Sequence, residues 1–113
     1  MNIDSEVMER AAVAASNLLK ALSNRHRLLI ICQLIDEERS VGELAEFLNL
    51  RDSTVSQHLA LLRRDGLVAA RRDGQTIFYS IASEPAREIL KTLYQAFCAP
   101  TNAKTAGRRS PAR

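Results

Sequence analysis

The pair Asp73-Gly74 constrains the fold most, because it places a tight turn between two short runs that resemble β-strands. Asp-Gly favours a two-residue hairpin turn, in which both central residues take a positive φ. The runs on either side, residues 67–72 and 75–81, contain apolar, β-branched and aromatic side chains. We therefore expect one antiparallel β-hairpin in this part of the chain.

Helical periodicity describes most of the remaining sequence, with apolar residues recurring three or four positions apart. Ser40 and Glu43 have the spacing of a capping box at the start of a short helix. The glycine at position 66 suits the C-terminal end of the next one. The predicted helices run from 5 to 22, from a cap at Ser23 or Asn24 to about Ile35, from Ser40 to Leu48, from Asp52 or Ser53 to just before Gly66, and from Pro85 to Cys98.

Length and composition indicate one small domain. The 113 residues are 46% hydrophobic but only 4% aromatic, which favours helices packed through aliphatic side chains. No stretch approaches the roughly 20 apolar residues of a membrane span, and the first residues lack the features of a secretory signal. We therefore expect no membrane partner and a cytoplasmic location. Residues 1–98 are predicted to form the domain, and residues 99–113 a flexible basic tail.

The net charge of +3 points to nucleic acid less directly than it first suggests. Four basic residues and no acidic ones lie within residues 99–113. Residues 1–50 hold five basic and eight acidic residues, whereas residues 51–75 hold five basic and three acidic ones. A basic patch on an otherwise acidic body can orient a protein toward phosphates, although an ordinary solvated surface would show the same counts.

The stronger indication of DNA binding is the third and fourth predicted helices, which a short turn at residues 49–52 joins. This layout inserts the fourth helix into the major groove of DNA. Its polar face carries side chains that can pair with base edges or phosphates, and its end carries two arginines that suit phosphates. The predicted contacts on this helix are Ser53, Thr54, Ser56, Gln57, His58, Arg63 and Arg64.

The hairpin follows this helix directly and completes a winged helix-turn-helix. We predict a mainly α fold with a β-hairpin wing, in the order α-α-α-α-β-β-α. The wing tip carries Arg71, Arg72 and Gln75, which can reach the DNA backbone or an adjacent minor groove. Taken alone, a polar helix or an arginine-rich turn would be an ordinary surface feature. Their succession favours the DNA-binding interpretation.

This order of elements resembles the ArsR/SmtB family of bacterial winged-helix repressors. The likeness rests on residues 21–28 (Ala-Leu-Ser-Asn-Arg-His-Arg-Leu), residues 53–59 (Ser-Thr-Val-Ser-Gln-His-Leu) and the Arg-Arg-Asp-Gly-Gln wing, and it covers about residues 6–98. It implies a homodimer joined through the first and last helices. It also implies binding to an inverted repeat in double-stranded DNA, with release by an inducer. Arg51 stands where the family often has a capping serine, so we expect Asp52 to supply that cap.

The chain lacks the metal ligands of many members of that family. Where those relatives have a Cys-x-Cys pair at the start of the third helix, this chain has Ser40 and Gly42. Others bind zinc through a histidine of the last helix, which contains none here. His26 and His58 begin separate predicted helices and lack ligand spacing. We expect neither a metal nor another cofactor.

Two cysteines remain, Cys32 in the second predicted helix and Cys98 at the end of the last. On spacing alone, two small buried hydrophobic residues are the commoner interpretation. The BigR/SqrR-type branch of persulfide and redox sensors, however, resembles this chain at both positions, including the run at residues 28–34 (Leu-Leu-Ile-Ile-Cys-Gln-Leu). The resemblance implies that a small sulfur compound or oxidant joins the two cysteines through a disulfide or polysulfide bridge and so releases DNA.

Three alternatives stay open. The first is a related repressor with another inducer or none, whose cysteines pack in the core. The second is a thiol enzyme, which the lack of a Cys-x-x-Cys pair and of a neighbouring base disfavours, so we expect no enzymatic activity. The third is a non-specific nucleoid-type binder, which would not need a reading helix with Gln57 and His58.

Overall fold

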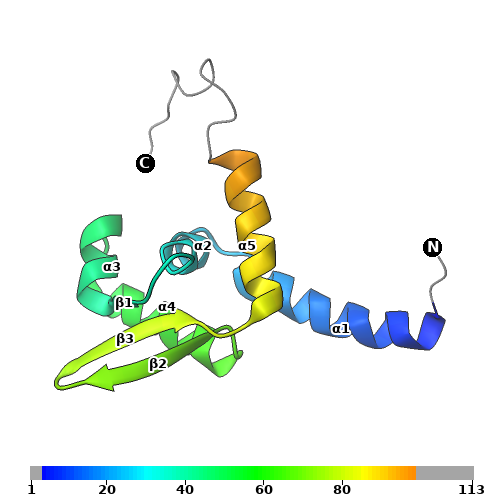
Figure 1. The fold of residues 1–113 in the computed structure, drawn as a ribbon, viewed down its shortest axis with the longest axis horizontal. Coiled ribbons are helices and arrows are strands. Elements are labelled where there is room, and N and C mark those ends of the chain that lie inside the picture. Colours follow the sequence, from blue (N-terminus) through cyan, green and yellow to red (C-terminus); the bar gives the residue numbers. More distant parts are fainter. Residues whose placement is uncertain (1–3, 99–113) are drawn as a thin grey trace, which may run out of the picture.

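The computed structural model describes residues 4–98, which form five helices and a small sheet (Figure 1). The fold is mainly helical with a β-hairpin wing, as predicted. The predicted tail, residues 99–113, lies outside the described residues. The elements are α1 Ser5–Leu22, α2 Arg25–Cys32, β1 Arg39–Ser40, α3 Val41–Leu48, α4 Asp52–Arg64, β2 Val68–Asp73, β3 Thr76–Ile81 and α5 Glu84–Phe97.

Polar side chains cap the helices that lead to the candidate site. The Asn24 side chain accepts a hydrogen bond from the Arg27 backbone N–H at 3.1 Å, so Asn24 rather than Ser23 is the N-cap of α2. Ser40 and Glu43 form the predicted capping box of α3, with bonds of 2.9 and 3.2 Å between each side chain and the other's backbone N–H. These caps satisfy N–H groups that have no partner within the helix.

Helix α2 ends at Cys32, so the prediction that it continues to about Ile35 is wrong. The chain tightens after Cys32, where the backbone N–H groups of Gln33 and Leu34 bond three residues back at 3.2 and 3.0 Å. The carbonyl of Ile35 then accepts a 2.6 Å bond from the Arg87 guanidinium of α5. A distant arginine therefore satisfies this carbonyl, in place of a further helical turn.

The predicted hairpin forms between β2 and β3, but its turn lies one residue later than expected. Asp73 is already paired with Thr76, so Gly74 and Gln75 are the two turn residues. Of these two, Gly74 alone has a positive φ, at 67°. A glycine at the first turn position takes this conformation without steric cost, which explains why the residue is suited to the tip.

The sheet has three antiparallel strands in the order β1-β3-β2. Strand β1 was not predicted, because its two residues are too few to show an alternating pattern. It pairs with β3 through Arg39↔Tyr79 and Ser40↔Phe78. The wing is thereby joined to the segment that follows α2.

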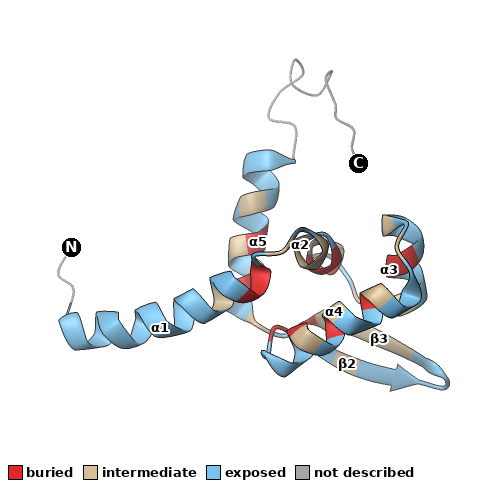
Figure 2. Ribbon diagram, turned by 180° about the vertical axis from the view of Figure 1, so that it is seen from behind, coloured by how far each residue is buried: buried red, intermediate tan, exposed pale blue. Residues whose placement is uncertain are grey.

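The hydrophobic core lies between α2, α3, α4 and the sheet, with one end of α5 packed against it (Figure 2). Its central side chains are fully buried and aliphatic: Ile30, Ile31, Leu44, Val55, Leu59, Leu62 and Leu90. Helix α1 contributes its C-terminal end, where Ala21 and Leu22 are buried and Leu18 packs against the core. The remainder of α1 extends away from the core and leaves most of its predicted apolar stripe exposed (Figures 1 and 2).

Candidate nucleic-acid interface

Helix α4 follows α3 through a tight turn in which Asn49 takes a left-handed φ of 56°. The residue before the helix is Arg51, whose side chain makes no capping bond. The expectation that Asp52 caps α4 is wrong, because Asp52 is already the first helical residue. A carboxylate there still favours the helix electrostatically, since it lies at the positive end of the helix dipole.

The orientation of α4 divides its residues into a packed and an open face. Val55, Leu59 and Leu62 are buried in the core, as predicted. Among the polar residues that we expected to contact DNA, Ser53, Ser56 and Gln57 are exposed, whereas Thr54 and His58 are half-buried. The fully exposed hydrogen-bonding face of this helix is therefore narrower than predicted.

His58 lies against α2. Its imidazole meets that of His26 edge-on, with ring centroids 5.8 Å apart and planes at 70°. The Nδ1 atom of His58 is buried and has no hydrogen-bond partner among the described residues. Burial lowers the pKa of His58, and the nearby Arg27 and His26 lower it further. A neutral ring packed between two helices suits an internal contact better than a base contact.

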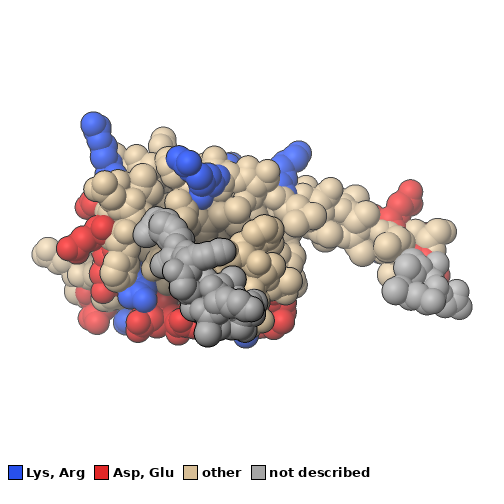
Figure 3. All heavy atoms as spheres, turned by 90° about the horizontal axis from the view of Figure 1, so that it is seen from above, with Lys and Arg blue, Asp and Glu red and all other residues tan. Residues whose placement is uncertain are grey.

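The basic residues predicted to meet phosphates are all exposed. Arg63 and Arg64 lie in the last turn of α4, and the Arg64 Nε donates to the adjacent Asp65 at 3.2 Å. At the wing, Arg72 and Gln75 are exposed, whereas Arg71 is paired with Glu38. Seen from above, basic side chains project from the upper edge of the molecule, whereas the lower edge shows mostly acidic side chains with a few basic ones among them (Figure 3). An uneven distribution of charge of this kind can orient a protein toward a polyanion.

The two cysteines lie at the ends of α2 and α5, although 66 positions separate them in sequence. Cys32 is the half-buried last residue of α2, and Cys98 is exposed at the end of α5; both are free thiols. Burial raises the pKa of the Cys32 thiol, and charge on Cys98 raises it further. The thiol at the end of α5 therefore influences the ionisation of the one at the end of α2.

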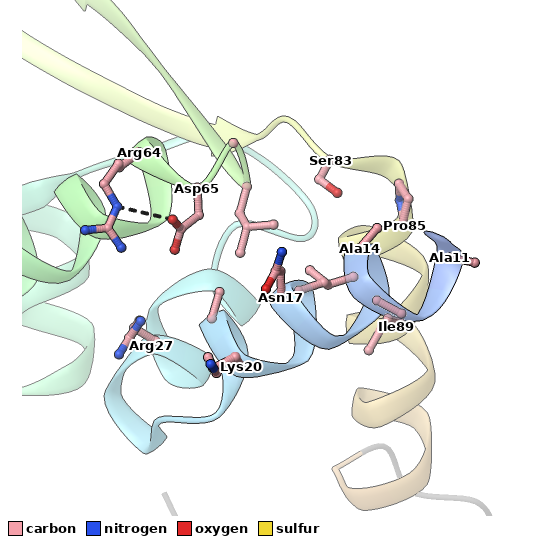
Figure 4. Close-up of a pocket in the computed structure, with 15 residues that line it drawn as sticks. Ala11, Ala14, Asn17, Lys20, Arg27, Arg64, Asp65, Ser83, Pro85 and Ile89 are labelled. Carbon is pink, nitrogen blue, oxygen red and sulfur yellow. Dashed lines mark hydrogen bonds and ion pairs between the residues drawn. The ribbon is translucent and has the colours of Figure 1, made fainter. Parts of the chain in front are cut away.

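A groove of about 940 Å³ runs between α1, α5 and the turn from α4 to β2 (Figure 4). Small apolar residues of α1, Ala11 and Ala14 among them, line it together with Pro85 and Ile89 of α5. Lys20, Arg27 and Arg64 line the other end. Over residues 4–98 we find no group of three or more metal-binding side chains and no helix long and apolar enough to span a membrane.

Comparison with known proteins decides the family. The family described as bacterial regulatory protein, arsR family, matches residues 24–70. The transcriptional activator HlyU of Vibrio cholerae is 47% identical over 91 residues, which cover 80% of this chain and 84% of that protein. The chain belongs to the ArsR family of bacterial transcription regulators. The biofilm growth-associated repressor of Agrobacterium fabrum is another relative, 43% identical over 93 residues, which cover 82% of this chain and 80% of that protein.

Solved structures of ArsR-family regulators share the whole fold. Reduced HlyU from Vibrio cholerae aligns with a TM-score of 0.80 and 46% identity, over 83% of this chain and 99% of that one. The repressor BigR from Xylella fastidiosa aligns with a TM-score of 0.78 and 40% identity, over 87% and 100%. A winged helix-turn-helix domain from Mycobacterium bovis, described as homodimeric, aligns with a TM-score of 0.69 and 30% identity. The alignment covers 85% of this chain and 89% of that one. The resemblance to this family, its BigR-type branch included, is confirmed.

Proposed function

We propose that this ArsR-family regulator is a homodimeric repressor that binds an inverted-repeat operator and releases it when a bridge joins Cys32 to Cys98. The single observation that carries the sensing part is the placement of these two thiols. Cys98 is exposed at the end of α5, Cys32 is half-buried at the end of α2, and charge on Cys98 raises the pKa of Cys32. The proposal gives the chain no enzymatic role and places it in the cytoplasm with the DNA.

The exposed Cys98 is suited to meet the inducer first, because a thiolate must be accessible to react. With a persulfide, the Cys98 thiolate takes up the outer sulfur and releases the donor's thiolate. Cys32 then attacks the Cys98 sulfur, which forms a Cys32–Cys98 disulfide and expels hydrosulfide. With a peroxide, Cys98 becomes a sulfenic acid and Cys32 displaces water from it. Both routes end in the same bond and oxidise the two thiols by two electrons.

A covalent bridge would tie the end of α5 to the end of α2. Helix α5 and helix α1 border the groove and leave large apolar side chains exposed, namely Val7, Met8, Val13, Leu19, Tyr94 and Phe97. Apolar surface of this kind favours a protein interface, and we assign it to a second copy of the chain. A shift of α5 would then change the separation of the two α4 helices, which must match two DNA half-sites.

For operator recognition we assign base contacts to Ser53, Ser56 and Gln57, which are exposed on α4. Thr54 lies at the edge of this surface. The side chains that suit the phosphate backbone are exposed as well: Arg63, Arg64, Arg72 and Gln75. In this proposal His58 keeps α4 against α2 and does not touch DNA.

The experiment uses the full chain and a DNA duplex that the wild-type protein enriches from a random library. After treatment with a persulfide donor or with peroxide, mass spectrometry should find a Cys32–Cys98 crosslink, and the duplex should be released. Cys32→Ser and Cys98→Ser should bind DNA normally but stay bound after treatment. Release from either serine variant, or no crosslink in the wild type, would contradict the sensing proposal.

Repression is tested separately, because the relatives include both an activator and repressors by name. A reporter driven by a promoter that carries the enriched sequence should fall when the regulator is supplied and rise when it is removed. The opposite change would make the chain an activator.

A second candidate function is a regulator with another inducer, which the packing of Cys32 against the core cluster favours. Normal release by a different compound in the Cys32→Ser variant would establish it.

A further inference from the structure

The Arg71 side chain crosses the sheet from β2 and reaches the segment just before β1. Its Nε donates to both carboxylate oxygens of Glu38, at 3.0 and 3.2 Å, and its Nη2 donates to one of them. On the way the guanidinium lies over the Phe78 ring of β3, 5.1 Å from the ring centroid. A more distant ion pair, at 3.9 Å, joins it to Asp73. One side chain therefore connects β2, β3 and the segment that leads into β1.

The neighbouring Arg72 points the other way. Successive side chains of a strand alternate between the two faces of a sheet. Arg71 is paired in register with Phe78, and Arg72 with Ile77. Since Tyr79 and Ile81 pack toward the core, Ile77 and Arg72 share that face and Arg71 lies on the outer one. Arg72 forms no ion pair within residues 4–98.

The outer part of the wing has few other attachments, because Val68 and Ile81 are buried in the core only at its base, whereas residues 71–76 are exposed. Strand β1 pairs with β3 at only two positions, 39 with 79 and 40 with 78, and strand β2 is at the open edge of the sheet. The Glu38–Arg71 pair connects β2 directly to the segment between α2 and β1. It forms between residues 33 positions apart. A bidentate guanidinium–carboxylate pair also fixes an orientation, which a single point contact does not.

We propose that Glu38 and Arg71 are positioning residues that hold the angle of the wing, and that Arg72 is the arginine of the wing that contacts the DNA backbone. This assignment revises the sequence-based expectation that both arginines touch DNA. It rests on the DNA binding of the family and does not depend on the cysteine mechanism. In this arrangement Glu38 supports DNA binding, although it carries a negative charge.

Removal of the Glu38 carboxylate should change DNA affinity in opposite directions, depending on whether Arg71 positions the wing or binds a phosphate itself. If Arg71 instead left Glu38 to bind a phosphate, the carboxylate would compete with DNA, and its removal would strengthen binding. If the pair positions the wing, removal of the carboxylate weakens binding. Glu37 supplies a matched control, because Glu37→Gln removes the same charge from the same segment. Glu37 pairs with Arg39 and not with Arg71.

The test measures the affinity of the full-length protein for the duplex that the wild type enriches from a random library, over a series of salt concentrations. The variants are Glu38→Gln, Arg71→Gln, both together, Arg72→Gln, the Glu37→Gln control, and the exchange Glu38→Arg with Arg71→Glu. Thermal unfolding of each variant checks that the fold is intact. Failure to enrich any duplex would count against DNA binding itself and so would be distinguished from failure of this proposal.

Relative to Glu37→Gln, Glu38→Gln should bind roughly threefold more weakly, the scale of an exposed ion pair. Arg71→Gln should show a similar decrease, the double variant should bind no more weakly than either single variant, and the exchange should restore affinity. The salt dependence should be unchanged in Arg71→Gln. In Arg72→Gln its slope should flatten by about 0.9 for each phosphate that the shortened side chain no longer reaches.

Three results would overturn the proposal. The first is tighter binding by Glu38→Gln than by the control. The second is a salt dependence that flattens in Arg71→Gln as much as in Arg72→Gln. The third is wild-type affinity in both Glu38→Gln and Arg71→Gln.

Discussion

The imidazole of His58, on α4, meets that of His26, on α2, edge-on at a centroid distance of 5.8 Å. Burial and the adjacent Arg27 and His26 lower the pKa of His58, so the folded protein disfavours its charged form. As the pH falls below about 6.5, the unfolded chain takes up a proton at this residue before the folded one does. Stability associated with His58 is therefore complete above that pH and is lost as the solution is acidified.

We predict that the free energy of unfolding falls more steeply between pH 7 and pH 5 in the wild type than in His58→Gln. Urea unfolding at a series of pH values measures both slopes, and the difference removes contributions that the two proteins share. The glutamine keeps a polar side chain of similar reach but does not titrate. Equal slopes in the two proteins would mean that His58 is not held neutral in the fold.

The exposed Gln57 is expected to read a base. Gln57→Ala should relax sequence preference at one position of each half-site, by about 1–3 kcal/mol of discrimination, while non-specific affinity changes little. Selection from a random library with the variant measures this directly. Gln95→Ala, an exposed glutamine on α5, is the control and should keep the wild-type preference. If both variants select the wild-type sequence, Gln57 does not read DNA.

The two thiols should react at different rates. Because its pKa is raised by burial and by Cys98, Cys32 is mostly the unreactive thiol at neutral pH. Iodoacetamide should therefore label the exposed Cys98 first in the folded protein. Labelling of Cys32 should increase steeply once the pH exceeds the ordinary pKa of a cysteine thiol. Mass spectrometry of peptides at timed intervals gives both rates. In denaturant the two cysteines should be labelled at the same rate. If the rates still differed there, the difference would come from the neighbouring sequence and not from the fold.

The capping box of α3 is expected to support the turn that leads into α4. Ser40→Ala removes the acceptor of the 3.2 Å bond from the Glu43 backbone N–H. It should lower the free energy of unfolding by about 1 kcal/mol, the usual effect of losing an N-cap. Glu46→Gln, on the exposed face of the same helix, is the control. Chemical denaturation that finds the two variants equally stable would show that the cap contributes nothing measurable.

The sequence predicted most of this fold because its signals are local. The hairpin turn at Gly74, the Ser40–Glu43 cap and the spacing of Val55, Leu59 and Leu62 each act within a few residues. Helices and hairpins form mainly through interactions between residues that are close in sequence, so such local patterns are enough to predict them.

What the sequence did not predict depends on residues far apart. The pairing of Glu38 with Arg71 spans 33 positions, and the bond from Arg87 to the Ile35 carbonyl spans 52. These interactions join the wing to the body and satisfy a carbonyl beyond the end of α2, and no local pattern predicts either. The packing of His58 on His26 was missed for the same reason, since the two helices meet only in the fold.

Most of α1 lies away from the domain core, with Val13 63% and Leu19 56% exposed. Under the proposed assembly a second subunit covers this face, so burial of α1 and formation of the dimer are a single event. At low abundance the amount of dimer then rises with the square of the subunit concentration. A cell that halves synthesis of the regulator would lose more than half of its bound operator. Operator occupancy would thus register gene dosage and dilution by growth as well as the state of the thiols.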